Sequence, residues 1–405
     1  MARVTEPGNG LVALSPLRVS RDAVFAVFAF NGLLVASFVS RLPDIRSALA
    51  LSNESLGFLL LATSVGSVLA LPFSGRLVDR FSAAGVVRAG ALLVGCGLVV
   101  AGFGATVLSW VPLTAAGMFV QGVGVSIWDV AMNVEGAEVE RRLGRTIMPR
   151  FHAAWSMGSI LGSAIGIPMA ALHVPVAIHL LVVVVPTYLL ALRFSTAFLP
   201  AAAHSAPEET ESPGQRQRSA WTEPRTLVLG LMVLTFAMVE GSANDWLSLG
   251  IIDGYQVPHW VGVSGFALFV ICMTAGRLTG PVLLDRFGRA PVLWSCTVAG
   301  LAGILLTVFG PNLGIAAIGI VIWGIGASLG FPVGMSAAAD APGRAAQRVS
   351  VVSTIGYGAF LIGPPFLGTI GDHVGTLRSL LVVAALMVPT ALTVFAARPP
   401  RAAQS

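Results

Sequence analysis

The sequence contains no lysine, and charged residues of all kinds make up only 11% of its 405 residues. A soluble protein of this size carries about 25% charged residues. So few charges cannot cover a water-exposed surface, particularly when 55% of the residues are hydrophobic. The composition therefore excludes an ordinary soluble protein and indicates a chain whose apolar surface faces lipid.

Other features are also missing. A phosphate-binding loop of the Gly-x-x-x-x-Gly-Lys-Ser/Thr type needs a lysine, so this chain cannot use ATP through such a loop. Its three cysteines, Cys96, Cys272 and Cys296, lie singly in apolar runs without disulfide or metal spacing. We expect no cofactor and no metal. The net charge of +5 fits topology signals in short loops, and we expect no nucleic-acid partner.

Apolar runs of the length that crosses a bilayer, about 20 residues, dominate the chain. Twelve such runs cover residues 23–40, 55–75, 89–107, 110–133, 151–172, 174–192, 226–252, 260–284, 290–309, 313–339, 349–370 and 380–397. If the N-terminus is cytoplasmic, every arginine except Arg41, Arg46 and Arg378 falls on the cytoplasmic side. This bias predicts that both termini are cytoplasmic.

One long polar segment, residues 195–223, separates the sixth and seventh runs. It is rich in Ala, Pro, Ser, Glu and Arg and lacks apolar periodicity, so we expect a disordered cytoplasmic linker. The sequence thus predicts an all-α membrane protein with twelve transmembrane helices. Residues 1–194 form the first six-helix bundle and residues 224–405 the second.

The two halves repeat each other in sequence. Asp79-Arg80-Phe81 follows the second run, and Asp285-Arg286-Phe287 follows the eighth, 206 positions later. Gly122-x-Gly124-x-Ser126 in the fourth run recurs as Gly324-x-Gly326-x-Ser328 in the tenth, 202 positions later. Repeats of this kind place a solute site near the bilayer midplane and allow alternating access.

The repeated loops resemble a motif of the major facilitator superfamily, found between its second and third and its eighth and ninth helices. That resemblance implies the superfamily fold of two pseudo-symmetric six-helix bundles. It also implies that the loop Asp acts in a cytoplasmic latch by facing a helix N-terminus, where a carboxylate is stabilised. The gating-loop residues carried over are Gly75, Asp79, Arg80, Asp285, Arg286, Gly288 and Arg289.

Within the superfamily, the chain is most similar to the fucose-permease-like branch and its uncharacterised bacterial inner-membrane members. The stretches that carry this similarity are residues 41–46, 128–136, 151–158 and 240–246. Two features depart from the pattern. The first loop has Ser82-Ala83 where the second has Gly288-Arg289, and residues 23–40 lack the acidic residue that the sugar permease uses.

Ionisable residues inside a span are costly and are therefore candidates for function. In the first half these are Asp129 and Glu135, with Asn133 one turn from Asp129 on the same helix face. They bind protons or gate transport, or else they cap helices and pair with nearby arginines. Asn31 and Gln121, near mid-depth, could bind a hydroxylated solute or serve only as interhelical hydrogen bonds.

In the second half, Glu240 lies near the predicted midplane of its span, and Asn244 follows one turn later. Asp245 and Trp246 continue toward the external side. A carboxylate at this depth tends to take up a proton because burial disfavours its charged form. We therefore predict that Glu240 binds a proton or the solute, with a structural ion pair as the alternative.

These features and the resemblance predict a secondary active transporter, coupled to protons, for a sugar-like or other small polar solute, rather than an enzyme. A proton-driven drug or metabolite exporter is the alternative within transport. A membrane sensor that kept the transporter fold is the alternative of another class. We expect a multi-pass, monomeric protein of the bacterial inner membrane whose partners are the lipid bilayer, a small-molecule substrate and protons.

Overall fold

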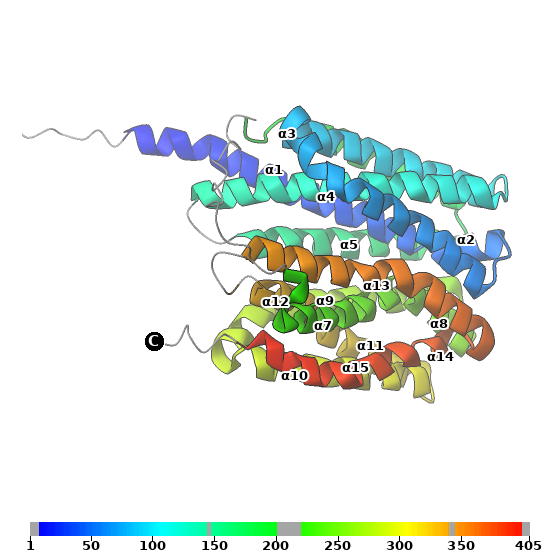
Figure 1. Ribbon diagram of the computed structural model, residues 1–405. Helices are drawn as coiled ribbons and strands as arrows, with labels where there is room; N and C mark the ends of the chain where they lie inside the picture. Colours follow the sequence, from blue (N-terminus) through cyan, green and yellow to red (C-terminus); the bar gives the residue numbers. More distant parts are fainter. Residues whose placement is uncertain (1–7, 144–146, 201–219, 339, 341–344, 399–405) are drawn as a thin grey trace, which may run out of the picture. The chain divides into compact units, whose positions relative to one another are not determined.

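The computed structural model describes residues 8–143, 147–200, 220–338, 340 and 345–398, and every element in this part of the chain is a helix (Figure 1). The elements are α1 (Gly8–Val39), α2 (Leu42–Ala48), α3 (Asn53–Thr106), α4 (Val111–Leu143), α5 (Met148–Ala171), α6 (Val176–Ser195), η2 (Ala220–Thr222), α7 (Pro224–Ser242), η3 (Ala243–Leu247), α8 (Ser248–Tyr255), α9 (His259–Phe287), α10 (Arg289–Phe309), α11 (Leu313–Ala327), α12 (Gly330–Ala338), α13 (Ala345–Val374), α14 (Thr376–Ser379), α15 (Leu381–Thr393) and η4 (Val394–Ala397).

Eleven helices in the described residues are long and apolar enough to cross a membrane. One of them, α3, has 54 residues, which is about 80 Å at 1.5 Å per residue and more than twice the hydrocarbon thickness. The second and third predicted spans, residues 55–75 and 89–107, both lie within it. The helical, multi-span fold is confirmed, while the number twelve and the cytoplasmic termini stay predictions.

These two predicted spans meet at a kink at Ser82, whose backbone has φ 65° and ψ 158°. The residue 206 positions later, Gly288 between α9 and α10, has nearly the same conformation, with φ 78° and ψ 169°. This region of backbone conformation is almost restricted to glycine. The first loop has therefore kept the repeated backbone shape although serine stands where the second loop has glycine.

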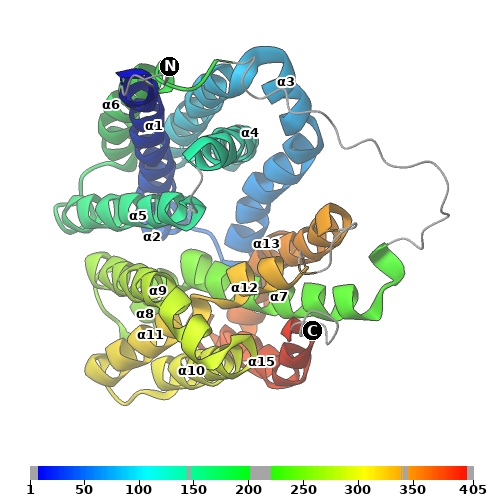
Figure 2. The same ribbon diagram turned by 90° about the vertical axis from the view of Figure 1, so that its left-hand side faces the viewer.

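The chain folds into two compact units. Unit 1 contains Met1–Phe38, Ala62–Gly162 and Pro175–Glu211, and unit 2 contains Val39–Leu61, Ser163–Val174 and Ser212–Ser405. Unit 2 thus includes two short segments from the first half of the sequence. In this unit α7 packs along α13, and α10 packs against α11 and α15 (Figure 2). The predicted division at residues 195–223 stays a prediction, and residues 201–219 of that linker lie outside the described residues.

The repeated glycines hold equivalent helix contacts in the two units. A Cβ on Gly122 of α4 would collide with the backbone oxygen of Thr63 in α3. A Cβ on Gly324 of α11 would meet the backbone oxygen of Phe269 in α9 in the same way. Thr63 and Phe269 are 206 positions apart, the same offset as the repeated loops. The sequence repeat is therefore a repeat of packing.

The second glycine of each motif makes a second equivalent contact. A Cβ on Gly124 would collide with the backbone nitrogen of Val94 in α3, and one on Gly326 would collide with that of Gly300 in α10. Val94 and Gly300 are again 206 positions apart. Each motif helix thus has backbone-close contacts on two sides, which small residues permit in a membrane where apolar burial does not drive helix association.

The conformation shared by Ser82 and Gly288 yields a stability prediction. Gly288→Ser should lower the free energy of unfolding by about 1–3 kcal/mol, because nothing lies near the added Cβ and only backbone strain changes. Ser82→Gly should instead raise the thermal unfolding midpoint, because it relieves that strain. The increase is reduced by the loss of the weak hydrogen bond that Gly85 N donates to Ser82 Oγ at 3.3 Å. Thermal unfolding in detergent tests both, and unchanged midpoints would contradict the strain argument.

Candidate functional site

The two amides predicted to contact a solute, Asn31 and Gln121, both make interhelical hydrogen bonds within unit 1. Trp155 Nε1 of α5 donates to Asn31 Oδ1 at 2.9 Å, and Thr63 Oγ1 of α3 donates to Gln121 Oε1 at 3.2 Å. Asn31 Nδ2 is buried and has no hydrogen-bond acceptor among the described residues. The oxygens therefore serve helix packing, while Asn31 Nδ2 is a buried donor without an acceptor in the same part of the chain.

Asp129 and Asn133 share one face of α4, as their spacing predicted. Asn133 Nδ2 donates to the Asp129 backbone oxygen at 2.8 Å and to Asp129 Oδ1 at 3.3 Å. Among the described residues no arginine pairs with Asp129, since Arg141 Nε instead donates to Glu138 at 2.9 Å. Asp129 is thus a half-buried carboxylate whose hydrogen-bond partner is a neutral amide.

Glu135 lies further along α4 and is fully buried. Its Oε1 accepts a hydrogen bond from Ser20 Oγ of α1 at 3.0 Å and another from the backbone nitrogen of Leu199, just beyond α6, at 2.7 Å. These contacts fasten the chain after α6 to α1 and α4. They match the structural alternative for Glu135 better than a proton-binding role.

Glu240 of α7 has an ionic partner that its position in the sequence did not indicate. Arg277 Nη2 of α9 donates to Glu240 Oε2 at 2.7 Å, and Arg277 Nε donates to the backbone oxygen of Ser328 at 3.3 Å. The Glu240 and Arg277 side chains are 14% and 22% exposed. Glu240 lies midway along the Pro224–Tyr255 span, so this ion pair sits deep within unit 2.

The next three candidates, Asn244, Asp245 and Trp246, fall in η3, a π-helical turn that joins α7 to α8. Such turns are rare and occur frequently at functional sites. Asp245 is half-buried, and no polar partner for its carboxylate is found among the described residues. Trp246 is fully buried and its Nε1 lacks an acceptor in the same part of the chain.

The predicted gating loops are exposed. Asp79 and Asp285 both face outward, and in the described part of the chain neither has a polar partner. Gly75 is also exposed, and Arg80 and Arg286 lie over the rings of the phenylalanines that follow them, at 5.4 and 5.3 Å. The repeat thus preserves side-chain arrangement, while the latch role of the two aspartates stays a prediction.

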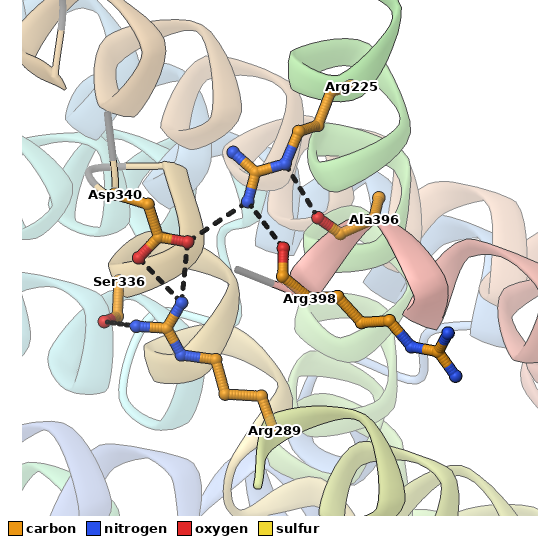
Figure 3. Close-up of polar contacts among 6 residues, drawn as sticks. All are labelled: Arg225, Arg289, Ser336, Asp340, Ala396 and Arg398. Atoms are coloured by element: carbon orange, nitrogen blue, oxygen red, sulfur yellow. Dashed lines mark hydrogen bonds and ion pairs between the residues drawn. The ribbon is translucent and has the colours of Figure 1, made fainter. Parts of the chain in front are cut away.

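The second loop is nevertheless bonded to its neighbours through Arg289 (Figure 3). Arg289 Nη1 donates to both carboxylate oxygens of Asp340 at 2.7 Å, and Arg225 Nη2 reaches Asp340 Oδ2 at 3.1 Å. Arg225 Nε also donates to the backbone oxygen of Ala396 at 3.0 Å. Asp340 therefore connects the starts of α7 and α10 just beyond the end of α12.

The equivalent carboxylate of unit 1 has different partners. Glu138 precedes Asp340 by 202 positions, the offset of the glycine motifs, yet within the described residues its ion pairs are with Arg141 and Arg142 of its own helix. Ala83 stands where Arg289 would be required. The two halves share packing but differ in the electrostatics of their loops.

A cluster that sequence reasoning missed lies at the opposite, predicted external end of unit 2. Arg46 of α2 forms a two-pronged ion pair with Asp253 of α8, with both N–O distances at 2.5 Å. Thr376 Oγ1 of α14 donates to the same carboxylate at 2.5 Å. We call this cluster, together with the contacts in the next paragraph, the external clamp.

Two further contacts complete the external clamp. Asp44 of α2 forms an ion pair with Arg41, with 2.9 Å between Oδ2 and Nε, and its Oδ1 lies 3.1 Å from His259 Nδ1, at the start of α9. Asp372 of α13 accepts from the backbone nitrogens of Asn53 and Glu54, at 2.7 and 2.9 Å, and so caps the N-terminus of α3. The three arginines that broke the topology bias included Arg41 and Arg46, a signal that could have marked this end.

The Arg46–Asp253 pair yields a prediction about stability. Its side chains are 16% and 30% exposed, so its strength should fall between that of surface and buried pairs, at about 1–2 kcal/mol. Arg46→Gln and Asp253→Asn should each lower the thermal unfolding midpoint. The double variant should be no less stable than the less stable of the two single variants. Arg378→Gln, at an exposed arginine of α14, is the control. Additive losses would contradict a direct pair.

Comparisons with known proteins give a consistent result. The chain matches the family model of the Major Facilitator Superfamily over residues 24–281 and 264–405. An uncharacterised transporter of Sinorhizobium fredii is 30% identical over 350 residues, covering 86% of this chain and 90% of the relative. An uncharacterised MFS-type transporter of Yersinia pestis is 31% identical over 353 residues, covering 85% and 87%.

Solved structures match in fold. The nucleoside transporter NupG superposes with a TM-score of 0.72 at 15% identity, covering 95% of this chain and 99% of that chain. FucP in its outward conformation superposes with a TM-score of 0.64 at 16% identity, covering 95% and 100%. Within the described residues no group of three or more His, Cys, Asp or Glu side chains is placed to hold a metal ion.

Proposed function

The chain belongs to the major facilitator superfamily, a family of multi-pass membrane transporters, and we propose that it is a secondary active transporter of one small solute. It works by alternating access in the bacterial inner membrane, with both termini cytoplasmic, and it couples transport to protons. The observation that carries the proposal is a carboxylate without a cationic partner in the described residues, Asp245, in a π-helical turn of a spanning helix.

A charge in a spanning helix requires compensation, because isolating it from water is expensive. Glu240 already has its counter-charge in Arg277. Asp245 has none among the described residues, and neither does Asp129 in unit 1. A proton supplies the missing positive charge. We therefore assign proton binding to Asp245 and Asp129 rather than to Glu240.

The Glu240–Arg277 pair then has a different role, which is to orient the solute or hold a conformational state. Arg277 presents a fork of donors, and Ser328 and Glu240 occupy two of its nitrogens. The remaining donors suit a solute rich in oxygen acceptors. A small polar, sugar-like substrate fits these donors of Arg277.

The proposal is tested by solute flux into proteoliposomes with an imposed pH gradient. Candidate solutes are first selected by thermal shift from a panel of sugars, polyols, nucleosides and lipophilic drugs. Accumulation of a polar solute that is dissipated by a proton ionophore would support proton-coupled uptake. Proton-driven efflux of a drug would support the exporter instead, and ligand-induced stabilisation without flux of any bound compound would favour a sensor.

Replacing the Asp245 carboxylate distinguishes a role in proton coupling from a role in solute binding. Asp245→Asn should abolish accumulation driven by the proton gradient but retain solute exchange between equal concentrations, because the neutral amide mimics the protonated acid. Asp22, whose side chain is 62% exposed and paired with its neighbour Arg21, provides the control variant Asp22→Asn. Accumulation by Asp245→Asn at the wild-type level would refute its coupling role.

The role of the Glu240–Arg277 ion pair is tested with a double variant that removes both charges. Glu240→Gln alone leaves the Arg277 charge without its carboxylate partner and should lower the thermal unfolding midpoint. The double variant Glu240→Gln with Arg277→Gln should restore part of that loss. If the pair serves the solute, the double variant should fold, bind the solute at least tenfold more weakly and keep any residual transport coupled to protons. Folded protein with unchanged solute affinity would assign the pair to structure alone.

A further inference from the structure

The external clamp has an unbalanced set of charges. Its charged side chains are Arg41 and Arg46 against Asp44, Glu54, Asp253 and Asp372, so acid groups outnumber arginines by two before its histidine is counted. That histidine, His259, is the remaining group of the clamp that can change this balance. Histidine changes charge in the physiological pH range, unlike the carboxylates and arginines around it. Protonation of His259 would reduce this excess of negative charge.

Two carboxylates lie on the segments around His259 when the clamp is closed. Asp44 Oδ1 is 3.1 Å from its Nδ1, and α8, which packs against α9, contributes Asp253. The nearby positive charges, Arg41 just before α2 and Arg46 on α2, are each paired with one of these carboxylates. The ends of α10 and α11 nearest this site carry no ionisable side chain.

A second histidine lies at the same end of unit 2 but is held differently. His373 of α13 follows the capping residue Asp372, and its Nδ1 lies 2.8 Å from the backbone oxygen of Thr369 in its own helix. The His373 side chain is exposed, and its ring contact stays within α13. His259, by contrast, contacts a carboxylate on a different segment. Protonation of His259 therefore acts between segments, and His373 supplies a matched control.

The His259–Asp44 contact is also accessible to solvent. The side chains of His259 and Asp44 are 33% and 21% exposed, so water can reach the ring and exchange its proton. Protonation turns a hydrogen bond between a neutral ring and the Asp44 carboxylate into an ion pair between opposite charges. Partly exposed pairs of this kind are weak, and a shift of about fivefold in an equilibrium is the most that such a pair is expected to produce.

The clamp joins segments that lie far apart in the sequence. All of its residues belong to unit 2. Those before position 61 are Arg41, which precedes α2, and residues of α2 and of the first turn of α3. Those after position 250 come from α8, α9, α13 and α14. Helix α2 and helix α8 lie at the same end of the structure (Figure 1). Separation of α2 from α8 and α9 would break the Arg46–Asp253 and Asp44–His259 contacts together.

We propose that the external clamp is a pH-sensitive lock, in which protonation of His259 strengthens its contact with Asp44 and favours the closed position of α2 against α8 and α9. Acid on this side of the membrane then favours closure, because the ion pair between His259 and Asp44 exists only in the closed clamp. The lock regulates access at the end of unit 2 and is separate from the solute and proton sites proposed above.

The test reads the clamp directly and does not require a known solute. Spin labels are placed at exposed positions 47 on α2 and 256 after α8, as Ser47→Cys and Gln256→Cys, with the three native cysteines replaced by alanine. Distances between the labels are measured in nanodiscs at pH 8 and pH 5.5. The ratio of short to long distances should increase at pH 5.5 by up to about fivefold.

The variants distinguish a histidine lock from a general effect of acid. His259→Gln and Asp44→Asn should each remove the pH dependence, while His373→Gln, at the exposed histidine of α13, should retain it. The thermal unfolding midpoint of each variant shows whether it is folded. An unchanged distance ratio in the parent, or a shift that survives in folded His259→Gln, would overturn the proposal, whatever the outcome of the flux assays.

Discussion

The arrangement of this chain depends on the cost of isolating a charge from water. That cost confines most of its arginines to the ends of helices and to loops, where headgroups and water solvate them. The few charges that remain within spans must then be compensated by a partner on another helix. Arg277 compensates Glu240 in this way at 2.7 Å. Asp245, by contrast, has no such partner in the described residues, and this contrast is what separates a structural pair from a candidate for proton binding.

The internal repeat has conserved packing more strictly than electrostatics. Gly122 and Gly324 bring equivalent helices to backbone contact at positions offset by 206. Ser82 even keeps the backbone conformation of Gly288 without being glycine. The carboxylates that follow the motif helices differ, because Asp340 pairs with Arg289 and Arg225 while Glu138 pairs within its own helix. Backbone-close packing tolerates little change, whereas a partly exposed ion pair can be replaced at small cost.

The sequence was sufficient for the helical multi-span fold, the repeat and the family, because each rests on local patterns such as run length and motif spacing. It was insufficient wherever two distant helices meet. The Glu240–Arg277 pair joins positions 37 residues apart on neighbouring helices, and Asp372 caps α3 from 319 residues away. Two features of the backbone could not be predicted from the sequence either. Two predicted spans meet at a single kinked residue, Ser82, and the turn at η3 is π-helical. Neither feature has a signature in hydropathy.

Two kinds of ion pair in unit 2 differ in what they can do. The Glu240–Arg277 pair is 14% and 22% exposed and lies midway along its span, where separating the charges is expensive, so it holds one arrangement. The Asp44–His259 contact, at helix ends and with a third of the ring exposed, is worth far less. A weak contact is a poor source of stability but a suitable control point, since a change of about 1 kcal/mol is enough to shift two states of similar energy. Where α2 meets α8 and α9, the weak Asp44–His259 contact can therefore adjust an equilibrium that the stronger Arg46–Asp253 pair also helps to set.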